Sequence, residues 1–114
     1  MKKAAQSAEI ILANTNLPLK DIVGIASISG EVYCFQKILK NRNSQIIILQ
    51  QKNEGEFLKT EKTFSLNKDS RITLSLKDLS YLSMSPIGKE YIGVIGFVND
   101  FYQGTSPDGF SWKI

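Results

Sequence analysis

The side chains that could act as nucleophiles or acids in this chain lack a partner base. The 114 residues include no histidine, which excludes Ser-His-Asp triads, Cys-His dyads and histidine-rich zinc sites. The one cysteine, Cys34, stands between Tyr33 and Phe35, where a thiol is usually a small buried hydrophobe. The closest carboxylate pair, Glu54 and Glu56, lies in the turn-like stretch NEGEF. We therefore expect a non-enzymatic protein that needs no cofactor and no metal.

A cluster of cations offers a second kind of chemistry. Lys37, Lys40 and Arg42 follow one another closely, and a basic hairpin can contact phosphates with a salt-dependent gain in binding. Tyr33 and Phe35 on the same strand would offer stacking faces for bases if they point outward. The net charge of the chain is only +3. These five residues therefore predict nucleic-acid binding as an alternative function.

Aromatic residues gather toward the end of the sequence. Phe101, Tyr102, Phe110 and Trp112 all fall within the stretch DFYQGTSPDGFSWKI. Large aromatics are favoured anchors at protein interfaces, but they also pack back into cores, and the two interpretations stay open. The first predicts that these four residues bind another protein. It also predicts that cutting the chain after Asp100 abolishes binding and leaves the fold intact.

The stretch SPDGFSW within this tail has the chemistry of a turn. Pro107 presets φ, Asp108 can bond its own backbone, and Gly109 is free to adopt a positive φ. The pattern resembles the S-x-D-G-x-x-W hairpin of many β-propellers and carbohydrate-binding sandwiches. That resemblance implies β architecture, in which the aspartate and the tryptophan lock a hairpin, and it implies nothing about a ligand.

The elements that position these residues are mostly strands. Residues 3–13 favour a short helix. From residue 21 onward, β-branched and apolar runs alternate with polar turns at spacings of roughly ten residues, and Ser29 with Gly30 predicts a two-residue hairpin turn. We expect an α+β fold in a single domain over residues 1–114: a short N-terminal helix, then about six mostly antiparallel strands forming a curved sheet or small barrel.

Residues 19–42 allow a second interpretation. The stretch LPLKDIVGIASISGEVYCFQKILKNR looks like a helix-turn-helix of bacterial regulators, with Leu19, Ile22 and Val23 at helical spacing and the cations on the recognition helix. Gly24 in mid-helix and the many β-branched residues oppose a helix. The sequence leaves hairpin and helix-turn-helix open.

The run DIVGIASISGEVYCFQKIL, followed by IIILQQKN and a late IGVIGFV, is similar to the β-rich C-terminal domain of LexA-like phage repressors. Members of that family are Ser-Lys autopeptidases. The resemblance places the family's lysine near Phe35 or Gln36, with Lys37 slightly displaced. No Ser-Met pair precedes LPLKDIV, where the family has its nucleophile. The resemblance therefore implies a site without activity.

Compartment and partners follow from composition. No apolar run approaches the roughly 18 residues of a membrane-spanning helix, and Gln6, Ser7 and Glu9 interrupt the first apolar stretch where a signal peptide would be continuous. A single cysteine excludes an internal disulfide and fits a reducing compartment. We expect a cytoplasmic adaptor that binds another protein and not a membrane, with nucleic acid as the alternative partner and homo-oligomerisation left open.

Overall fold

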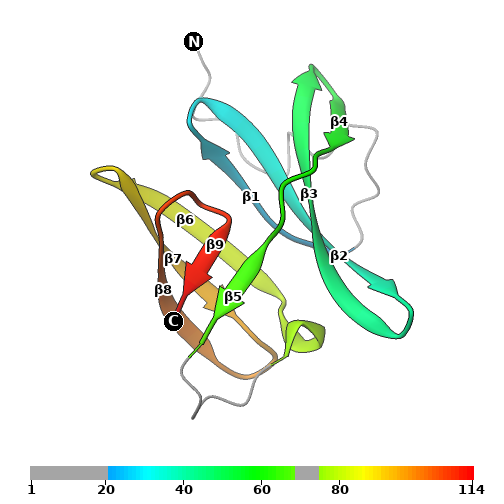
Figure 1. Cartoon of the computed structure of the whole chain (residues 1–114), viewed down its shortest axis with the longest axis vertical. Helices are drawn as coiled ribbons and strands as arrows, with labels where there is room; N and C mark the ends of the chain where they lie inside the picture. The colour runs from blue at the N-terminus through cyan, green and yellow to red at the C-terminus, as the bar shows by residue number, and fades with distance from the viewer. Residues whose placement is uncertain (1–20, 69–74) are drawn as a thin grey trace.

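The computed structural model describes residues 21–68 and 75–114, which form two β-sheets (Figure 1). The first has the order β1-β2-β3-β4 and the second β5-β9-β8-β7-β6; all neighbours are antiparallel except β5 and β9. The strands of the first sheet are β1 (Ile22–Ile28), β2 (Glu31–Lys40), β3 (Asn43–Asn53) and β4 (Glu56–Lys59). Those of the second are β5 (Ser65–Asn67), β6 (Tyr81–Ile87), β7 (Glu90–Gly96), β8 (Phe101–Ser106) and β9 (Ser111–Lys113).

The predicted α+β class is wrong, because the regular structure of the described residues consists of strands apart from one short helical turn. Their one helical element is η2 (Leu76–Asp78), a single 3₁₀ turn that precedes β6. The predicted helix over residues 3–13 lies outside the described residues. The described part of the chain has nine strands instead of about six. The run from residue 56 to 67 divides into β4 and β5, residues 81–87 form β6, and the aromatic tail adds β8 and β9, whereas the strand expected over residues 71–76 lies mostly outside the described residues.

Residues 22–40 form a hairpin, so the helix-turn-helix interpretation is wrong. Ile28 pairs with Glu31 across the turn, and Ser29 and Gly30 have φ of 52° and 80°. A type I′ turn requires positive φ at both central positions, and glycine supplies one of them without steric cost. The β2–β3 hairpin is closed in the same way by Asn41 and Arg42, with φ of 51° and 68°.

One hydrophobic core fills the space between the two sheets. Alternate residues of β2 and β3 point into it, and it meets residues of the second sheet and of the segments that flank it. Its buried members are Val23, Ile28, Tyr33, Phe35, Ile46, Ile48, Leu79, Leu82, Ile95, Phe97, Phe110 and Trp112. The ring of Phe110 lies 5.1 Å from that of Tyr33 and 6.2 Å from that of Phe35. Contacts between aromatic rings therefore join β2 to the segment that enters β9.

The two sheets approach most closely where β1 meets β6. A side chain at Gly24 would collide with the backbone carbonyl of Leu82, so only glycine lets the two strands come this near. The register of β1 against β2 shifts between Ile22 and Gly24, as in a β-bulge that bends a strand.

Candidate functional site

The SPDGFSW stretch is a hydrogen-bonded turn between β8 and β9. The hydroxyl of Ser106 accepts the N–H of Gly109 at 2.7 Å. The Asp108 carboxylate oxygen Oδ1 accepts the N–H groups of Phe110 at 2.8 Å and Ser111 at 2.9 Å. The Ser106 hydroxyl also accepts the N–H of Asp108 at 3.3 Å, so the side chains of Ser106 and Asp108 together accept four backbone N–H groups of this turn.

The tryptophan completes the same turn, as the S-x-D-G-x-x-W pattern predicted. The indole Nε1–H of Trp112 donates to the carbonyl of Gly109 at 2.9 Å, and Gly109 has a φ of 90°. Only 1% of Trp112 is exposed. The predicted turn is confirmed, and its aspartate and tryptophan serve the fold.

The four aromatic residues of the tail do not form one patch. Phe110 and Trp112 are buried in the core. Tyr102 is half-buried and packs edge-on against Phe97, with ring centroids 6.0 Å apart. Phe101 is 68% exposed. Consecutive residues of a strand point to opposite faces, so Phe101 alone of the four is mainly exposed to solvent.

The residues of the predicted nucleic-acid site are also separated. Tyr33 and Phe35 are buried in the core and point away from the exposed basic tip of the β2–β3 hairpin. The ammonium of Lys37 donates to the carbonyls of Lys77 at 2.9 Å and Leu79 at 2.8 Å. Lys37 therefore links β2 to η2 and to the residue that follows η2. The position of its ammonium is explained by these contacts within the fold.

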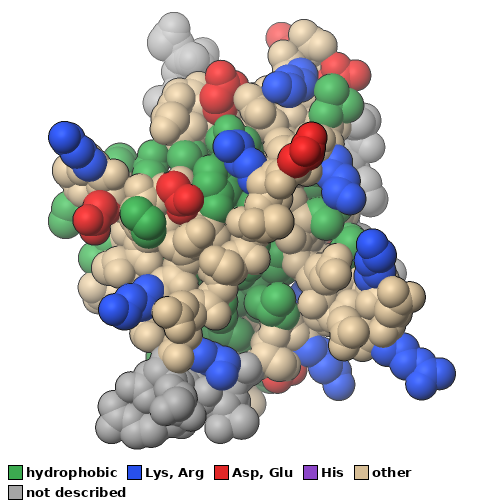
Figure 2. Space-filling model, viewed as in Figure 1, with side chains coloured by type: hydrophobic (Ala, Val, Ile, Leu, Met, Phe, Trp, Pro, Cys, Tyr) green, Lys and Arg blue, Asp and Glu red, His purple; other side chains and the backbone are tan. Residues whose placement is uncertain are grey.

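Lys40 and Arg42 remain at the exposed tip of the β2–β3 hairpin. Figure 2 shows basic side chains over this projecting hairpin, at the lower right, while acidic and basic groups are interspersed over much of the rest of that face. Leu39 beside them is 74% exposed. The structure therefore keeps two of the three predicted cations together on the surface.

A different surface stands out on the second sheet. Cross-strand partners on β6, β7 and β8 share a face, and this face points away from the core because Leu82, Ile95 and Tyr102 occupy the other side. Its members form three rows across the strands: Tyr81, Gly96 and Phe101; Ser83, Val94 and Gln103; Ser85, Ile92 and Thr105. We call these nine residues the neutral face, because none of them carries a formal charge.

Two aromatic rings are the largest exposed apolar groups of the neutral face. Tyr81 is 46% exposed and Phe101 68%, and their centroids lie 6.1 Å apart at 75°. Gly96 lies between them: a Cβ there would be 2.7 Å from Cε1 of Phe101 and 2.9 Å from Cβ of Tyr81. Glycine thus lets both rings pack over the backbone of β7. Val94, 39% exposed, extends the apolar surface along the same strand.

The structure gives no support to chemistry at the cysteine. Cys34 is fully buried, and burial raises the pKa of its thiol to about 12, so the nucleophilic thiolate does not form at neutral pH. Across residues 21–68 and 75–114, no three His, Cys, Asp or Glu side chains are grouped as a metal site. In the same residues no helix is long and apolar enough to cross a membrane.

Comparisons with protein-family models, curated proteins and solved structures found no match for this chain. The similarity to LexA-like repressors therefore gains no support. Lys37, the lysine nearest the family's catalytic position, is held by two backbone carbonyls. The neutral face remains the most prominent exposed apolar surface of the second sheet.

Proposed function

We propose that this protein is a non-enzymatic interaction module that binds another protein through the neutral face. The observation that carries the proposal is the exposure of Tyr81, Val94 and Phe101 on nine neighbouring positions without a formal charge. Apolar groups on such a surface can be covered by a partner without desolvating an ion, which is the costly step in burying a polar surface. Interface centres are likewise depleted of charge and enriched in aromatics.

The composition of the neutral face favours a protein over a nucleic acid. Binding to a polyanion draws on cations that neutralise phosphates. The nine residues of the neutral face include none, and a single cation, Lys113 on β9, adjoins the face beside Thr105. Its hydroxyl and amide groups, on Ser83, Ser85, Gln103 and Thr105, suit the polar rim of a protein interface. We infer a partner surface that is uncharged and partly apolar.

The size of the face points to a transient complex. Three strands about 4.8 Å apart and five residues rising about 3.4 Å each give a patch on the order of 250 Å², against about 800 Å² per partner in a standard stable interface. An adaptor that binds and releases its partner fits this area. We place it in the cytoplasm, since its one thiol, Cys34, is buried and forms no disulfide within the described residues.

The proposal is tested with two variants of the face and one matched control. Immobilised wild-type protein, Phe101→Ser, Tyr81→Ser and Leu39→Ser are compared by quantitative affinity capture, and the partner is then purified. Leu39 is the control because it is a large exposed apolar residue on a distant hairpin. Loss of a buried ring costs roughly 1.5–3 kcal/mol, so both face variants should weaken binding at least about tenfold, and Leu39→Ser should not.

Retention of the partner by both face variants would refute the proposal. Sedimentation analysis of the wild type gives a second outcome: a dimer that Phe101→Ser dissociates would show that the neutral face binds another copy of this chain instead of a different protein.

Nucleic-acid binding is a second candidate, favoured by one observation. At the tip of the β2–β3 hairpin an exposed Leu39 directly precedes the cations Lys40 and Arg42, and proteins that enter the minor groove of DNA combine cations with apolar wedges. Fluorescence anisotropy with single- and double-stranded oligonucleotides at low and physiological salt tests it. The double variant Lys40→Gln, Arg42→Gln should lower the salt slope by about two. An unchanged slope would rule this function out. Lys37 is left intact because it holds the fold.

A further inference from the structure

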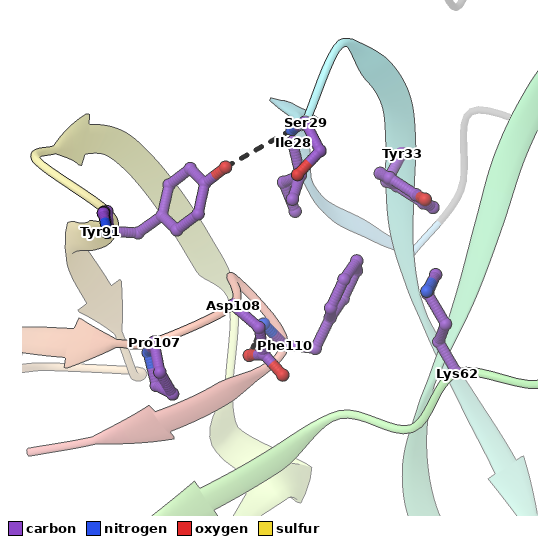
Figure 3. Close-up of a pocket in the computed structure, with 9 residues that line it drawn as sticks. Ile28, Ser29, Tyr33, Lys62, Tyr91, Pro107, Asp108 and Phe110 are labelled. Atoms are coloured by element: carbon purple, nitrogen blue, oxygen red, sulfur yellow. Dashed lines mark hydrogen bonds between the residues drawn. The ribbon is translucent and has the colours of Figure 1, made fainter.

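Three turns from distant parts of the chain meet at one end of the sheets. They are the β1–β2 turn at Ser29, the β6–β7 turn at Lys89 and the β8–β9 turn at Pro107 and Asp108, and the segment with Lys62 joins them from β4 to β5. Between them opens a cavity of about 360 Å³ (Figure 3), within the size range of small-molecule sites. We call it the three-turn cleft. It lies apart from the neutral face, with which it shares no residue.

The floor of the three-turn cleft is apolar and fixed. Ile28, Tyr33 and Phe110 are all buried core residues that also line the cavity. Tyr33 and Phe110 meet edge to face at 5.1 Å and 84°, which is a preferred arrangement of aromatic pairs. The floor is therefore formed by residues of the packed core, on which the surrounding turns are supported.

The rim carries charges of both signs, and of these only the acid accepts hydrogen bonds from the backbone. Asp108 uses Oδ1 to hold the N–H groups of its own turn. The ammonium of Lys62 lies 5.0 Å from the centroid of Phe110 and 6.0 Å from that of Tyr33. Neither Lys62 nor Lys89 has an ion pair within the described residues, and the cleft carries a surplus of one positive charge: two lysines against one aspartate.

The position of Lys62 decides which kind of ligand the cleft can take. Its ammonium lies within cation–π range of the two floor rings, Tyr33 and Phe110, so an incoming cation would meet a like charge beside them. An incoming anion would instead meet a counter-charge beside an apolar floor. Tyr91, across the cleft from Lys62 (Figure 3), accepts the N–H of Ser29 at 3.3 Å and keeps its own hydroxyl hydrogen to donate.

We propose that the three-turn cleft binds a small carboxylate with an apolar or aromatic body. The body rests on Ile28, Tyr33 and Phe110, the carboxylate pairs with Lys62, and Lys89 adds positive charge at the rim. Free acids and the C-terminus of a peptide share this chemistry.

The test uses N-acetylphenylalanine and its amide, which share one body and differ in charge, with benzoate as a free acid without a peptide group. Titrations are followed by amide chemical shifts of the full chain. N-acetylphenylalanine should shift Ser29, Lys62 and Gly109 saturably, with a Kd on the order of 1 mM for so small a ligand. The amide should bind about fivefold more weakly, the size of one partly exposed charge pair. Equal binding of benzoate would indicate a site for free acids, and weaker benzoate a site for peptide C-termini.

Two variants separate the cleft from general effects. Lys62→Gln should give the same fivefold loss for the acid and none for the amide, whereas Lys40→Gln on the distant hairpin should change neither. Equal affinities for acid and amide, or an unchanged affinity of Lys62→Gln for the acid, would overturn the assignment. Phe101→Ser should bind N-acetylphenylalanine as the wild type does. The proposal for the three-turn cleft and the proposal for the neutral face can therefore fail independently of each other.

Discussion

At the scale of single residues, Asp108 makes the clearest link between a charge and the fold. Burial acts to raise its pKa, but hydrogen bonds from the N–H groups of Ser111 and Phe110 and from the hydroxyl of Ser106 outweigh burial and hold the pKa below its ordinary value. A carboxylate whose pKa is lower in the folded state stabilises the protein fully above its unfolded pKa, near 3.9. This stabilisation is lost as pH falls through the lower folded pKa.

We therefore predict that the free energy of unfolding, measured with urea, falls below about pH 4 and that Asp108→Asn reduces this fall. Asparagine keeps an acceptor for the two N–H groups but has no charge to lose. Asp108→Ala removes both the acceptor and the charge. At pH 7 it should lower the free energy of unfolding by about 1–2 kcal/mol, a modest loss because the carboxylate is largely exposed. An acid dependence identical in Asp108→Asn and wild type would contradict this role.

Lys37 is a second residue whose role became visible only in the folded chain. Its ammonium is the donor to the carbonyls of Lys77 and Leu79, so Lys37→Met should destabilise the fold by about 1–2 kcal/mol in urea unfolding. Lys40→Met, three residues along the same strand but exposed, should change stability by less than about 0.5 kcal/mol. Equal effects of the two substitutions would show that the contacts to Lys77 and Leu79 add nothing.

At the scale of elements, the crossing of β1 and β6 depends on Gly24. A methyl group there meets the carbonyl of Leu82, and because that atom belongs to the backbone the strands themselves must move apart. Overpacking of this kind costs about 1–3 kcal/mol. Thermal unfolding of Gly24→Ala should show this loss, whereas Ser27→Ala, exposed on the same strand, should be close to neutral. A stable Gly24→Ala would mean that the two sheets can separate without penalty.

The elements predicted correctly are those that local chemistry specifies. Ser29 and Gly30 correctly predicted the turn of the first hairpin, because few residues tolerate two successive positive φ angles. The Ser106, Asp108 and Trp112 spacing marked the last turn, because each of its bonds spans only a few residues. Those features could be predicted without knowing where the rest of the chain lies.

The elements missed depend on contacts between distant segments. Tyr81 is absent from the predicted site residues, although Tyr81, Ser83 and Ser85 alternate with apolar residues along β6. The aromatic tail was treated as one group, although strand alternation sends Phe101 outward and Tyr102 inward. Register determines which neighbours those faces meet, and sequence alone does not supply it. The neutral face could therefore not be predicted.

At the scale of the whole molecule, the aromatic tail is part of the structure that joins the two sheets. Phe110 contacts the rings of Tyr33 and Phe35 on β2, and Trp112 fills the space beside Gly93 on β7, where a Cβ would lie 2.7 Å from Cη2 of the indole. Two surfaces with different chemistry result: the neutral face outside the second sheet and the three-turn cleft at the end of both. Each is positioned by β8 or by the turn that follows it.

Cutting the chain after Asp100 should therefore destroy the fold, contrary to the expectation from sequence that it would abolish only binding. The cut removes β8 and β9 together with Phe110 and Trp112. Loss of a buried Phe or Trp side chain costs about 3–5 kcal/mol each, so the two together approach the 5–15 kcal/mol that stabilises a typical domain. We expect far-UV circular dichroism of the truncated chain to show no cooperative thermal transition.

Phe101→Ser is the matched control, because it removes the exposed ring and keeps both strands. Trp112 is the only tryptophan and lies in the core, so its blue-shifted emission should persist in this variant and move to longer wavelength only on unfolding. A truncated chain that still unfolds cooperatively near the wild-type temperature would show that the first sheet and β6–β7 hold together unaided. The aromatic tail would then be dispensable for folding, and its contribution to the two proposed surfaces would be confined to the residues that it supplies, Phe101 to the neutral face and Phe110 to the three-turn cleft.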